Sequence, residues 1–171
     1  MHGSLGKIAA GAAFTIVEIL VVISIILVLA GLVLATSGYV YNKGARSRAE
    51  AEIAAMSAAL ENYKADNGTF PTSGLLPTES DPTKYFDASE ILYASLCGDT
   101  DGDGQPGPGT SYMAFKSNQL GADNGKTFVK DPFGNSYGYS TAGPTSGGYN
   151  PTFDLWSTAN STTTAQWVKN W

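Results

Sequence analysis

The chain has 171 residues and a formal net charge of −5, with 15 acidic residues, 10 basic residues, one histidine and one cysteine. The acidic balance and the lack of a Lys/Arg cluster argue against nucleic acid as the main partner, because phosphate binding needs concentrated cationic side chains. A single cysteine, Cys97, excludes an intrachain disulfide. In an exported domain we expect it to be a small buried apolar residue.

Residues 14–34 form an apolar run that is broken only by Thr15, Glu18 and Ser24. A helix of about 21 residues spans roughly 30 Å of hydrocarbon, so the run predicts a membrane-spanning helix. A carboxylate near the start of such a helix costs several kcal/mol in lipid unless a partner meets it. Glu18 is therefore the first candidate functional residue.

The small residues 9–13 precede the apolar run. In an ordinary secretory signal the small cleavage residues follow the apolar core, so the order here argues against that class. A cut before Phe14 would instead leave the whole helix on the mature protein as an anchor. An uncleaved signal anchor is the alternative.

Residues 14–23, FTIVEILVVI, resemble the processing and assembly signal of type IV pilins and of the pseudopilins of type II secretion. The resemblance implies that a prepilin peptidase cuts between Ala13 and Phe14 and that the new Phe14 amine is methylated. It also implies that Glu18, fifth in the mature chain, directs assembly. The family prefers Gly before the cut, and this chain has Ala13 there.

The helix is predicted to continue beyond the membrane, since residues 45–67 contain no proline. Apolar residues recur there in steps of three and four, which is typical of one buried helix face. They are Ala49, Ile53, Met56, Leu60 and Tyr63. Asn67-Gly68 predicts the end of the helix, and Pro71 bars its continuation.

Beyond the long helix the pattern predicts a second helix within residues 89–97 and a segment, 98–126, that is mostly loop. Strands are predicted at 127–130, 136–140 and 152–157. Residues 136–140 have the alternation of a half-buried strand, and residues 152–157 alternate Phe153, Leu155 and Ser157 on one face with Asp154 and Trp156 on the other. The expected fold is α+β and type IV pilin-like. One long N-terminal helix, transmembrane and then amphipathic, packs on a small antiparallel sheet of two or three strands with long loops.

The expected organisation has three parts. Residues 1–13 form a leader peptide, residues 14–44 form the transmembrane or filament-core helix, and residues 45–171 form a soluble head that includes the amphipathic half of the helix.

Downstream segments sharpen the resemblance. Residues 59–71, ALENYKADNGTFP, residues 131–137, DPFGNSY, and the FDLWS stretch at 153–157 are similar to major pseudopilins of type II secretion. In that family the subunits polymerise into a short periplasmic filament that helps drive folded proteins through an outer-membrane pore. The implied partners are other copies of the chain, the prepilin peptidase, minor pseudopilins, the inner-membrane assembly platform and, before assembly, membrane lipid.

One segment carries candidate metal ligands. Asp99, Asp101 and Asp103 alternate with small residues and are followed by Gly104, which is typical of the front half of a calcium loop. The twelfth position of an EF-hand would be Glu, and here it is Thr110, so no EF-hand is completed. The pattern leaves two interpretations open, a partial calcium loop and a solvated acidic turn.

No motif indicates an enzyme. The only histidine, His2, lies in the predicted leader, and the sequence has no nucleophile motif, Walker loop or dinucleotide fingerprint. We therefore expect a pseudopilin-like structural subunit, single-pass in the inner membrane with a periplasmic head, that enters a periplasmic filament. The alternatives are a type IV pilin for adhesion, motility or DNA uptake, and a monomeric membrane-tethered domain that binds calcium or glycan. A glycan would be bound by Trp156, Trp167 and Trp171, for which core packing is the competing explanation.

Overall fold

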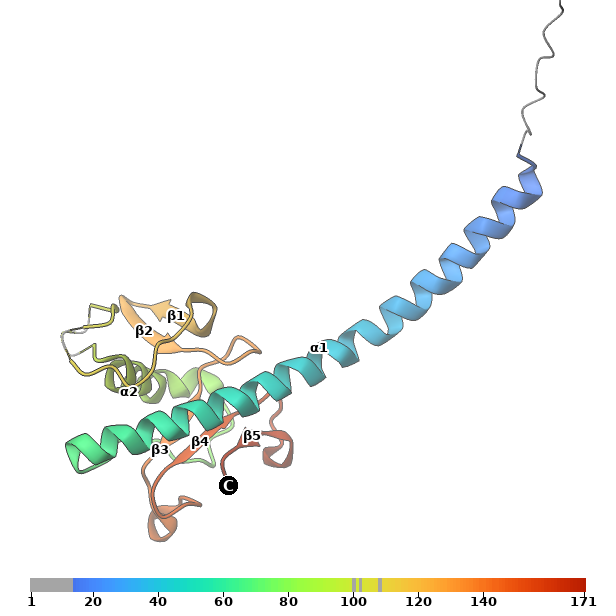
Figure 1. Ribbon diagram of the computed structural model, residues 1–171. Helices are drawn as coiled ribbons and strands as arrows, with labels where there is room; N and C mark the ends of the chain where they lie inside the picture. The colour runs from blue at the N-terminus through green and yellow to red at the C-terminus, as the bar shows by residue number, and fades with distance from the viewer. Residues whose placement is uncertain (1–13, 100, 102, 108) are drawn as a thin grey trace, which may run out of the picture. The chain divides into compact units, whose positions relative to one another are not determined.

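The computed structural model describes residues 14–99, 101, 103–107 and 109–171 (Figure 1). The chain divides into two compact units, Met1–Tyr41 and Asn42–Trp171, which are described separately below. In the first unit the described residues are almost entirely helix. The second unit, called the head below, contains the remaining helices and every described strand.

Helix α1 runs without a break from Ile16 to Asn67, 52 residues in all. It ends where the sequence predicts. Gly68 has a φ of +79°, the left-handed conformation that glycine adopts without strain, and its N–H donates to the Lys64 carbonyl at 2.8 Å.

The head half of α1 buries one face against the rest of the head. The predicted apolar stripe is confirmed for four of its five members, while Tyr63 is only half-buried. The buried residues of the helix are Ala45, Ala49, Ile53, Met56, Ala59 and Leu60.

Helix α2 spans Phe86–Cys97 and starts three residues earlier than predicted. A short 3-10 turn, Pro82–Tyr85, leads into it, and the Asp81 carboxylate accepts the Thr83 N–H at 3.0 Å at the start of that turn. Because this capped turn runs directly into α2, the helix begins at Phe86. It ends at Gly98, which has a φ of +76°.

The described strands form two antiparallel sheets. The first is a hairpin of β1 (Leu120–Asp123) and β2 (Lys126–Val129). Its turn residues, Asn124 and Gly125, have φ values of +50° and +79°, as a tight hairpin turn requires. The second sheet has the order β3-β4-β5, with β3 at Gly138–Ser140, β4 at Asp154–Ser157 and β5 at Val168–Lys169.

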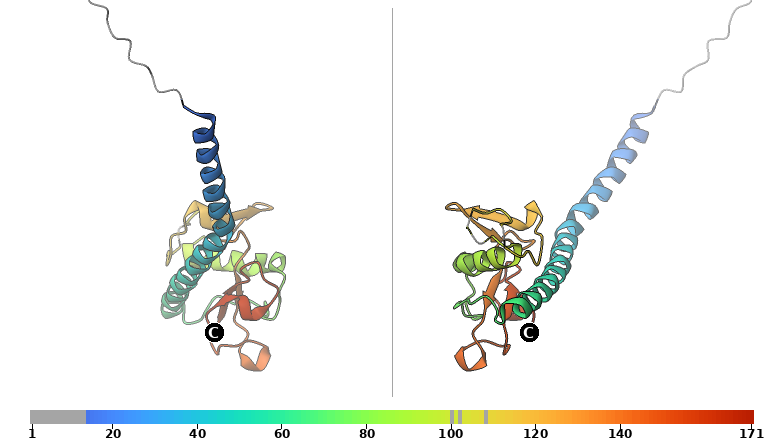
Figure 2. Two further views of the ribbon diagram at one scale, coloured as in Figure 1. Left: turned by 90° about the vertical axis from the view of Figure 1, so that its right-hand side faces the viewer. Right: turned by 60° about the vertical axis from the view of Figure 1, so that its left-hand side comes forward.

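The α+β class and the long helix packed on small antiparallel sheets are therefore confirmed. The prediction of a single sheet of two or three strands was wrong, because β1 lies inside the segment expected to be mostly loop and β5 was not expected. Figures 1 and 2 show the hairpin on one side of α2 and the three-stranded sheet on its other side.

Strand β4 lies between two apolar clusters. Leu155 packs into the larger cluster with α1 and α2, and Trp156 packs into a smaller one with Tyr85 and Trp167. All three residues of β3 and all four of β4 are buried, so the half-buried pattern predicted for residues 136–140 was wrong. The smaller cluster covers the face of β4 that carries Trp156. Trp156 and Trp167, at 0% and 3% exposed, are therefore core residues.

Candidate functional site

The first candidate site is the apolar half of α1. The large apolar side chains between Phe14 and Tyr41 are exposed, whereas in the described head only Leu76 and Tyr149 are of this kind. An exposed apolar surface of this extent marks a site that meets lipid or another protein. The helix is long and apolar enough to cross a bilayer, although a signal sequence near an N-terminus passes the same test of length and composition.

Glu18 is the only charged residue between Phe14 and Tyr41. Its Oε2 atom accepts two hydrogen bonds from Thr15, one from the backbone N–H and one from the hydroxyl, both at 2.9 Å. In return the Glu18 N–H donates to the Thr15 hydroxyl oxygen at 3.2 Å. This is a capping box, in which the residue before the helix and the third helical residue satisfy each other's backbone donors.

The capping box changes the interpretation of Glu18. Its carboxylate lies at the N-terminal end of α1, where the helix dipole favours negative charge. Among the described residues both hydrogen bonds go to Oε2, which leaves Oε1 free to accept another donor. The sequence analysis treated Thr15 only as a break in the apolar run. The pattern Thr-x-x-Glu before an apolar stretch is the signal that would have identified it.

The serine hydroxyls of the apolar half are satisfied within the helix itself. Ser24 donates to the Leu20 carbonyl at 2.8 Å, and Ser37 donates to the Leu34 carbonyl at 2.9 Å. Such bonds let serine lie in an apolar environment at low cost. Glu18 is thus the one charged group among the described residues of this half, and its burial requires a partner from outside the helix.

The predicted cleavage site lies at the edge of the described chain. Ala13 is outside the described residues. Phe14 is 80% exposed and directly precedes Thr15, the first residue of the capping box. Cleavage between Ala13 and Phe14, and methylation of Phe14, stay predictions.

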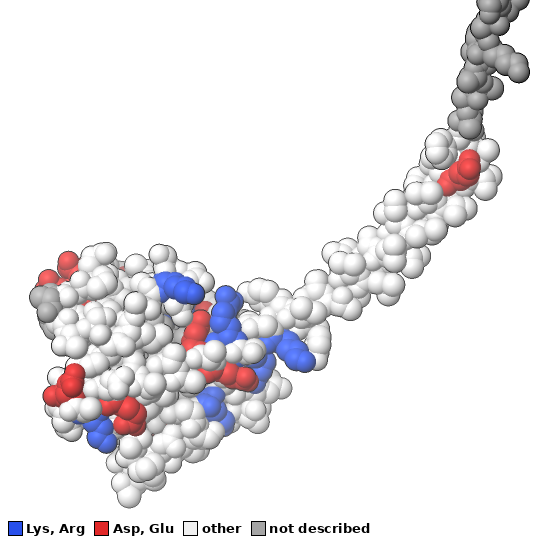
Figure 3. Space-filling model, viewed as in Figure 1, with Lys and Arg blue, Asp and Glu red and all other residues white. Residues whose placement is uncertain are grey.

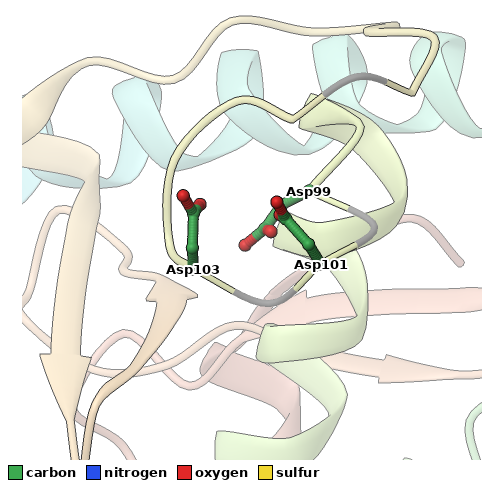
Figure 4. Close-up of side chains that lie close together, drawn as sticks. All are labelled: Asp99, Asp101 and Asp103. Atoms are coloured by element: carbon green, nitrogen blue, oxygen red, sulfur yellow. The ribbon is translucent and has the colours of Figure 1, made fainter.

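The second candidate site is the acidic loop that follows α2. One carboxylate oxygen from each of Asp99, Asp101 and Asp103 lies within 4.8 Å of the others, and Figure 4 shows the three side chains gathered inside the curve of the loop. Asp99 is buried, and the other two are exposed. The fold holds the loop in place, because the Asp99 carboxylate accepts the Gly104 N–H at 3.0 Å and the Tyr93 hydroxyl donates to the Gly104 carbonyl at 2.7 Å.

This spacing fits a calcium ion. Calcium binds oxygen ligands at about 2.3–2.6 Å, so ligands on opposite sides of one ion lie up to about 5 Å apart. The three carboxylate oxygens meet this limit and are hard, anionic donors. The structure thus brings together the three residues that the sequence identified, and calcium binding by them stays a prediction.

A buried carboxylate in the head has a structural role that the sequence did not reveal. Asp131, 2% exposed, accepts the N–H groups of Phe133 and Asn135, each at 2.9 Å, and the Ser157 hydroxyl at 2.5 Å. Burial raises the pKa of the Asp131 carboxyl above its usual value of 3.8, while these hydrogen bonds act in the opposite direction. Asp131 therefore ties the predicted turn after β2 to the end of β4.

No protein-family model matches the chain, and no curated protein or solved structure is significantly similar to it. A function for this protein therefore has to be argued from its own residues. The two features that carry such an argument are the exposed apolar half of α1, with Glu18 at its start, and the acidic loop after α2.

Proposed function

We propose that this protein is a structural subunit that polymerises through its N-terminal helix into a periplasmic pseudopilus for type II protein secretion. The observation that carries the proposal is the apolar half of α1, which is exposed up to Tyr41 and contains one charged residue, Glu18. Such a surface needs lipid or other helices around it. A subunit that moves from membrane to filament uses both in turn.

The proposed sequence of events begins in the inner membrane, with α1 spanning the bilayer once and the head in the periplasm. The prepilin peptidase cuts between Ala13 and Phe14, and the Phe14 amine is methylated. The assembly platform and minor pseudopilins then bring copies together, so that the apolar halves of neighbouring helices replace lipid around each subunit. The chain acts by assembly and not by catalysis.

Glu18 sets the axial register in this proposal. Its Oε1 atom, which Thr15 does not use, would accept a hydrogen bond from the Phe14 amine of the adjacent copy. An ammonium and a carboxylate that meet in an apolar environment compensate each other's desolvation, whereas either one alone is strongly unfavourable. Only one axial offset between neighbouring helices brings the two groups together.

The test replaces Glu18 with Val in cells that contain the prepilin peptidase and the assembly platform. We expect Glu18→Val to be inserted and its head to fold, with the yield of sheared filaments reduced at least tenfold relative to total membrane protein. The control is Glu50→Val, which removes an exposed carboxylate from the head half of α1 and should leave the yield unchanged. Equal yields for Glu18→Val and the unaltered protein would refute the proposal.

A type IV pilin for adhesion, motility or DNA uptake is the alternative, because its N-terminal helix would have the same character. The absence of an intrachain disulfide favours the pseudopilin, since many adhesive pilins use one to fasten the C-terminal region. Cys97 is a single buried thiol, 2% exposed. Antibody labelling of intact cells separates the two, since a pilus is accessible on the cell surface and a pseudopilus is periplasmic.

We further propose that the acidic loop binds calcium, with Asp99, Asp101 and Asp103 as ligands. The observation that favours it is the convergence of the three carboxylates within 4.8 Å. We expect a dissociation constant of roughly 10⁻⁴ to 10⁻³ M, as for extracellular modules, and a higher melting temperature of the head in calcium than in chelator. Asp101→Ala should abolish the shift and Asp123→Ala should retain it. A shift that survives Asp101→Ala would place the ion elsewhere.

A further inference from the structure

A groove in the head runs beside α1 and has a volume of about 380 Å³. Its apolar lining residues are Ala51 and Ala55 from α1 with Met113 and Ala114 from the segment before β1. Arg48 and Lys116 also line the groove, and both are exposed. Glu52 also lines the groove, but its carboxylate accepts the Tyr137 hydroxyl at 2.7 Å.

This groove carries two cations, Arg48 and Lys116, and one carboxylate, Glu52, so it has a net positive charge on an acidic head. Residues 42–171 contain 14 acidic and nine basic residues. Two of the described lysines, Lys84 and Lys126, are in ion pairs with glutamates at 3.0 Å and 2.8 Å. Within the described part of the chain, Arg48 and Lys116 form no ion pair, so the groove offers two cations to an outside anion.

The acidic loop lies at the other end of the head. Asp99 shares a surface hollow with Tyr63 and Asn67, the last turn of α1, whereas the groove begins at Arg48. Nineteen residues of helix separate Arg48 from Asn67, which is roughly 28 Å along the axis. Figure 3 shows most of the visible Lys and Arg beside α1 where the head begins, with Asp and Glu among them, and further Asp and Glu at the opposite edge of the head.

We propose that the groove at Arg48 and Lys116 of one copy binds the acidic loop of a second copy through Asp101 and Asp103. The two surfaces are complementary in charge and belong to the same chain, so every copy carries both halves of the contact. A contact between two different surfaces forms a closed ring if the rotation between copies closes and an open filament if it does not, and the proposed filament needs the open case. Pro106, three residues after Asp103, is exposed and would supply a rigid apolar contact for the alanines that line the groove.

This contact rests on the proposed filament and adds to it an interface outside the apolar helix. Copies joined in this way are displaced by roughly 28 Å along α1, the separation of groove and loop within one head. They are therefore a different pair from the adjacent copies that Glu18 and Phe14 join, since those two residues lie only about 6 Å apart along the helix. The acidic loop then has a second proposed role besides calcium binding. The tests below are made in chelator so that calcium does not occupy Asp101 and Asp103.

The first test is disulfide cross-linking of the full mature chain in its own membrane, with Cys97, buried in the head, replaced by Ala in every variant. The pair Lys116→Cys and Asp103→Cys should give a ladder of linked dimers, trimers and longer species on oxidation. The control pair, Lys116→Cys with Asp123→Cys at the hairpin tip, should give none. Absence of a ladder from the first pair overturns the proposal.

The second test exchanges the charges. Arg48→Glu with Lys116→Glu, and separately Asp101→Lys with Asp103→Lys, should each lower the sheared-filament yield at least tenfold. Combining all four changes should restore the yield to within threefold of the unaltered protein. The matched control, Glu61→Lys with Asp123→Lys on exposed sites, should stay within twofold. Failure of the combined variant to recover overturns the proposal.

The outcomes separate this contact from the proposed function. Filaments that depend on Glu18, with no ladder and no charge rescue, overturn the contact and leave the function standing. A chain that never forms filaments overturns the function, while a ladder from the Lys116 and Asp103 pair in the membrane would still support the contact. If Arg48→Glu with Lys116→Glu instead weakens binding to phosphatidylglycerol vesicles and the combined variant gives no filament rescue, the groove is a lipid surface and the contact is wrong.

Discussion

Replacing Glu18 with Gln separates two roles that Glu18→Val removes together. A glutamine side chain has the same shape, and its Oε1 atom can accept both Thr15 hydrogen bonds, so the capping box is kept. The negative charge is lost. If Glu18 acts only as a helix cap, Glu18→Gln should assemble normally, and if it pairs with the Phe14 amine of a neighbour it should not.

Loss of the charge pair and loss of the helix cap should weaken subunit association by different amounts. Two unit charges 4 Å apart interact by about 4 kcal/mol at an effective dielectric constant of 20, and part of this is offset by desolvation. A loss of about 2–4 kcal/mol corresponds to a roughly 30- to 1,000-fold weaker subunit association. Thr15→Val removes only the hydroxyl half of the capping box. A cap is typically worth about 1 kcal/mol, so this variant should weaken association only about fivefold.

The measurement is the critical concentration of purified mature protein for filament formation, supported by the sheared-filament yield from cells. We expect the critical concentration to increase in the order unaltered protein, Thr15→Val, Glu18→Gln and Glu18→Val. The largest increase should fall between Thr15→Val and Glu18→Gln. Normal assembly of Glu18→Gln would refute charge pairing and leave capping as the role of Glu18. Equal damage from Thr15→Val and Glu18→Gln would also contradict the reasoning.

Two further predictions concern the head, and both are measured by tryptophan fluorescence of the mature protein in detergent. Burial raises the folded-state pKa of the Asp131 carboxyl above 3.8, so the folded head binds the carboxyl proton more tightly than the unfolded chain does. The contribution of Asp131 to the free energy of unfolding therefore falls as the pH rises above 3.8. The melting temperature of Asp131→Asn relative to the unaltered protein should therefore rise with pH and then level off, and a pH-independent difference would contradict this. Gly98→Ala should lower the free energy of unfolding by about 1–3 kcal/mol, because φ is +76° and the new Cβ would lie 2.7 Å from the Gly109 carbonyl oxygen. Gly74→Ala, which meets nothing within 4 Å, is its control, and equal stability of the two variants would be inconsistent with strain at residue 98.

The helical part of the fold could be predicted from the sequence because its signals are local. The apolar stripe through Met56 repeats with the helical period, and Gly68 ends α1 because its conformation suits a position that other residues avoid. The hairpin turn Asn124-Gly125 is equally local, and the sequence analysis overlooked it among the other glycines of that segment. Thr15 was overlooked in the same way, since a capping box can be read from four consecutive residues.

The sheet could not be predicted as well, because it depends on residues far apart in the chain. The two-residue strand β5 exists only through its pairing with β4, and nothing in its composition marks it. Burial of Asp131 depends on Ser157, 26 residues later. The candidate calcium loop combines both cases. Its alternating aspartates are visible in the sequence, whereas their convergence depends on the Tyr93 hydroxyl holding Gly104.

Asn170, which is added late in synthesis, completes the hydrogen bonding of β4 in the three-stranded sheet. Its N–H donates to the Leu155 carbonyl at 3.2 Å, and its side-chain oxygen accepts the Leu155 N–H at 2.9 Å, so it fastens the edge of β4 beyond β5. During synthesis these bonds cannot form until residue 170 has been added, almost 130 residues after Tyr41 ends the apolar half of α1. At about 5–20 residues per second, that interval is on the order of ten seconds. During this interval the apolar half of α1 has already been synthesised, whereas β4 still lacks its partner β5. The helix can therefore enter a bilayer before the head is complete.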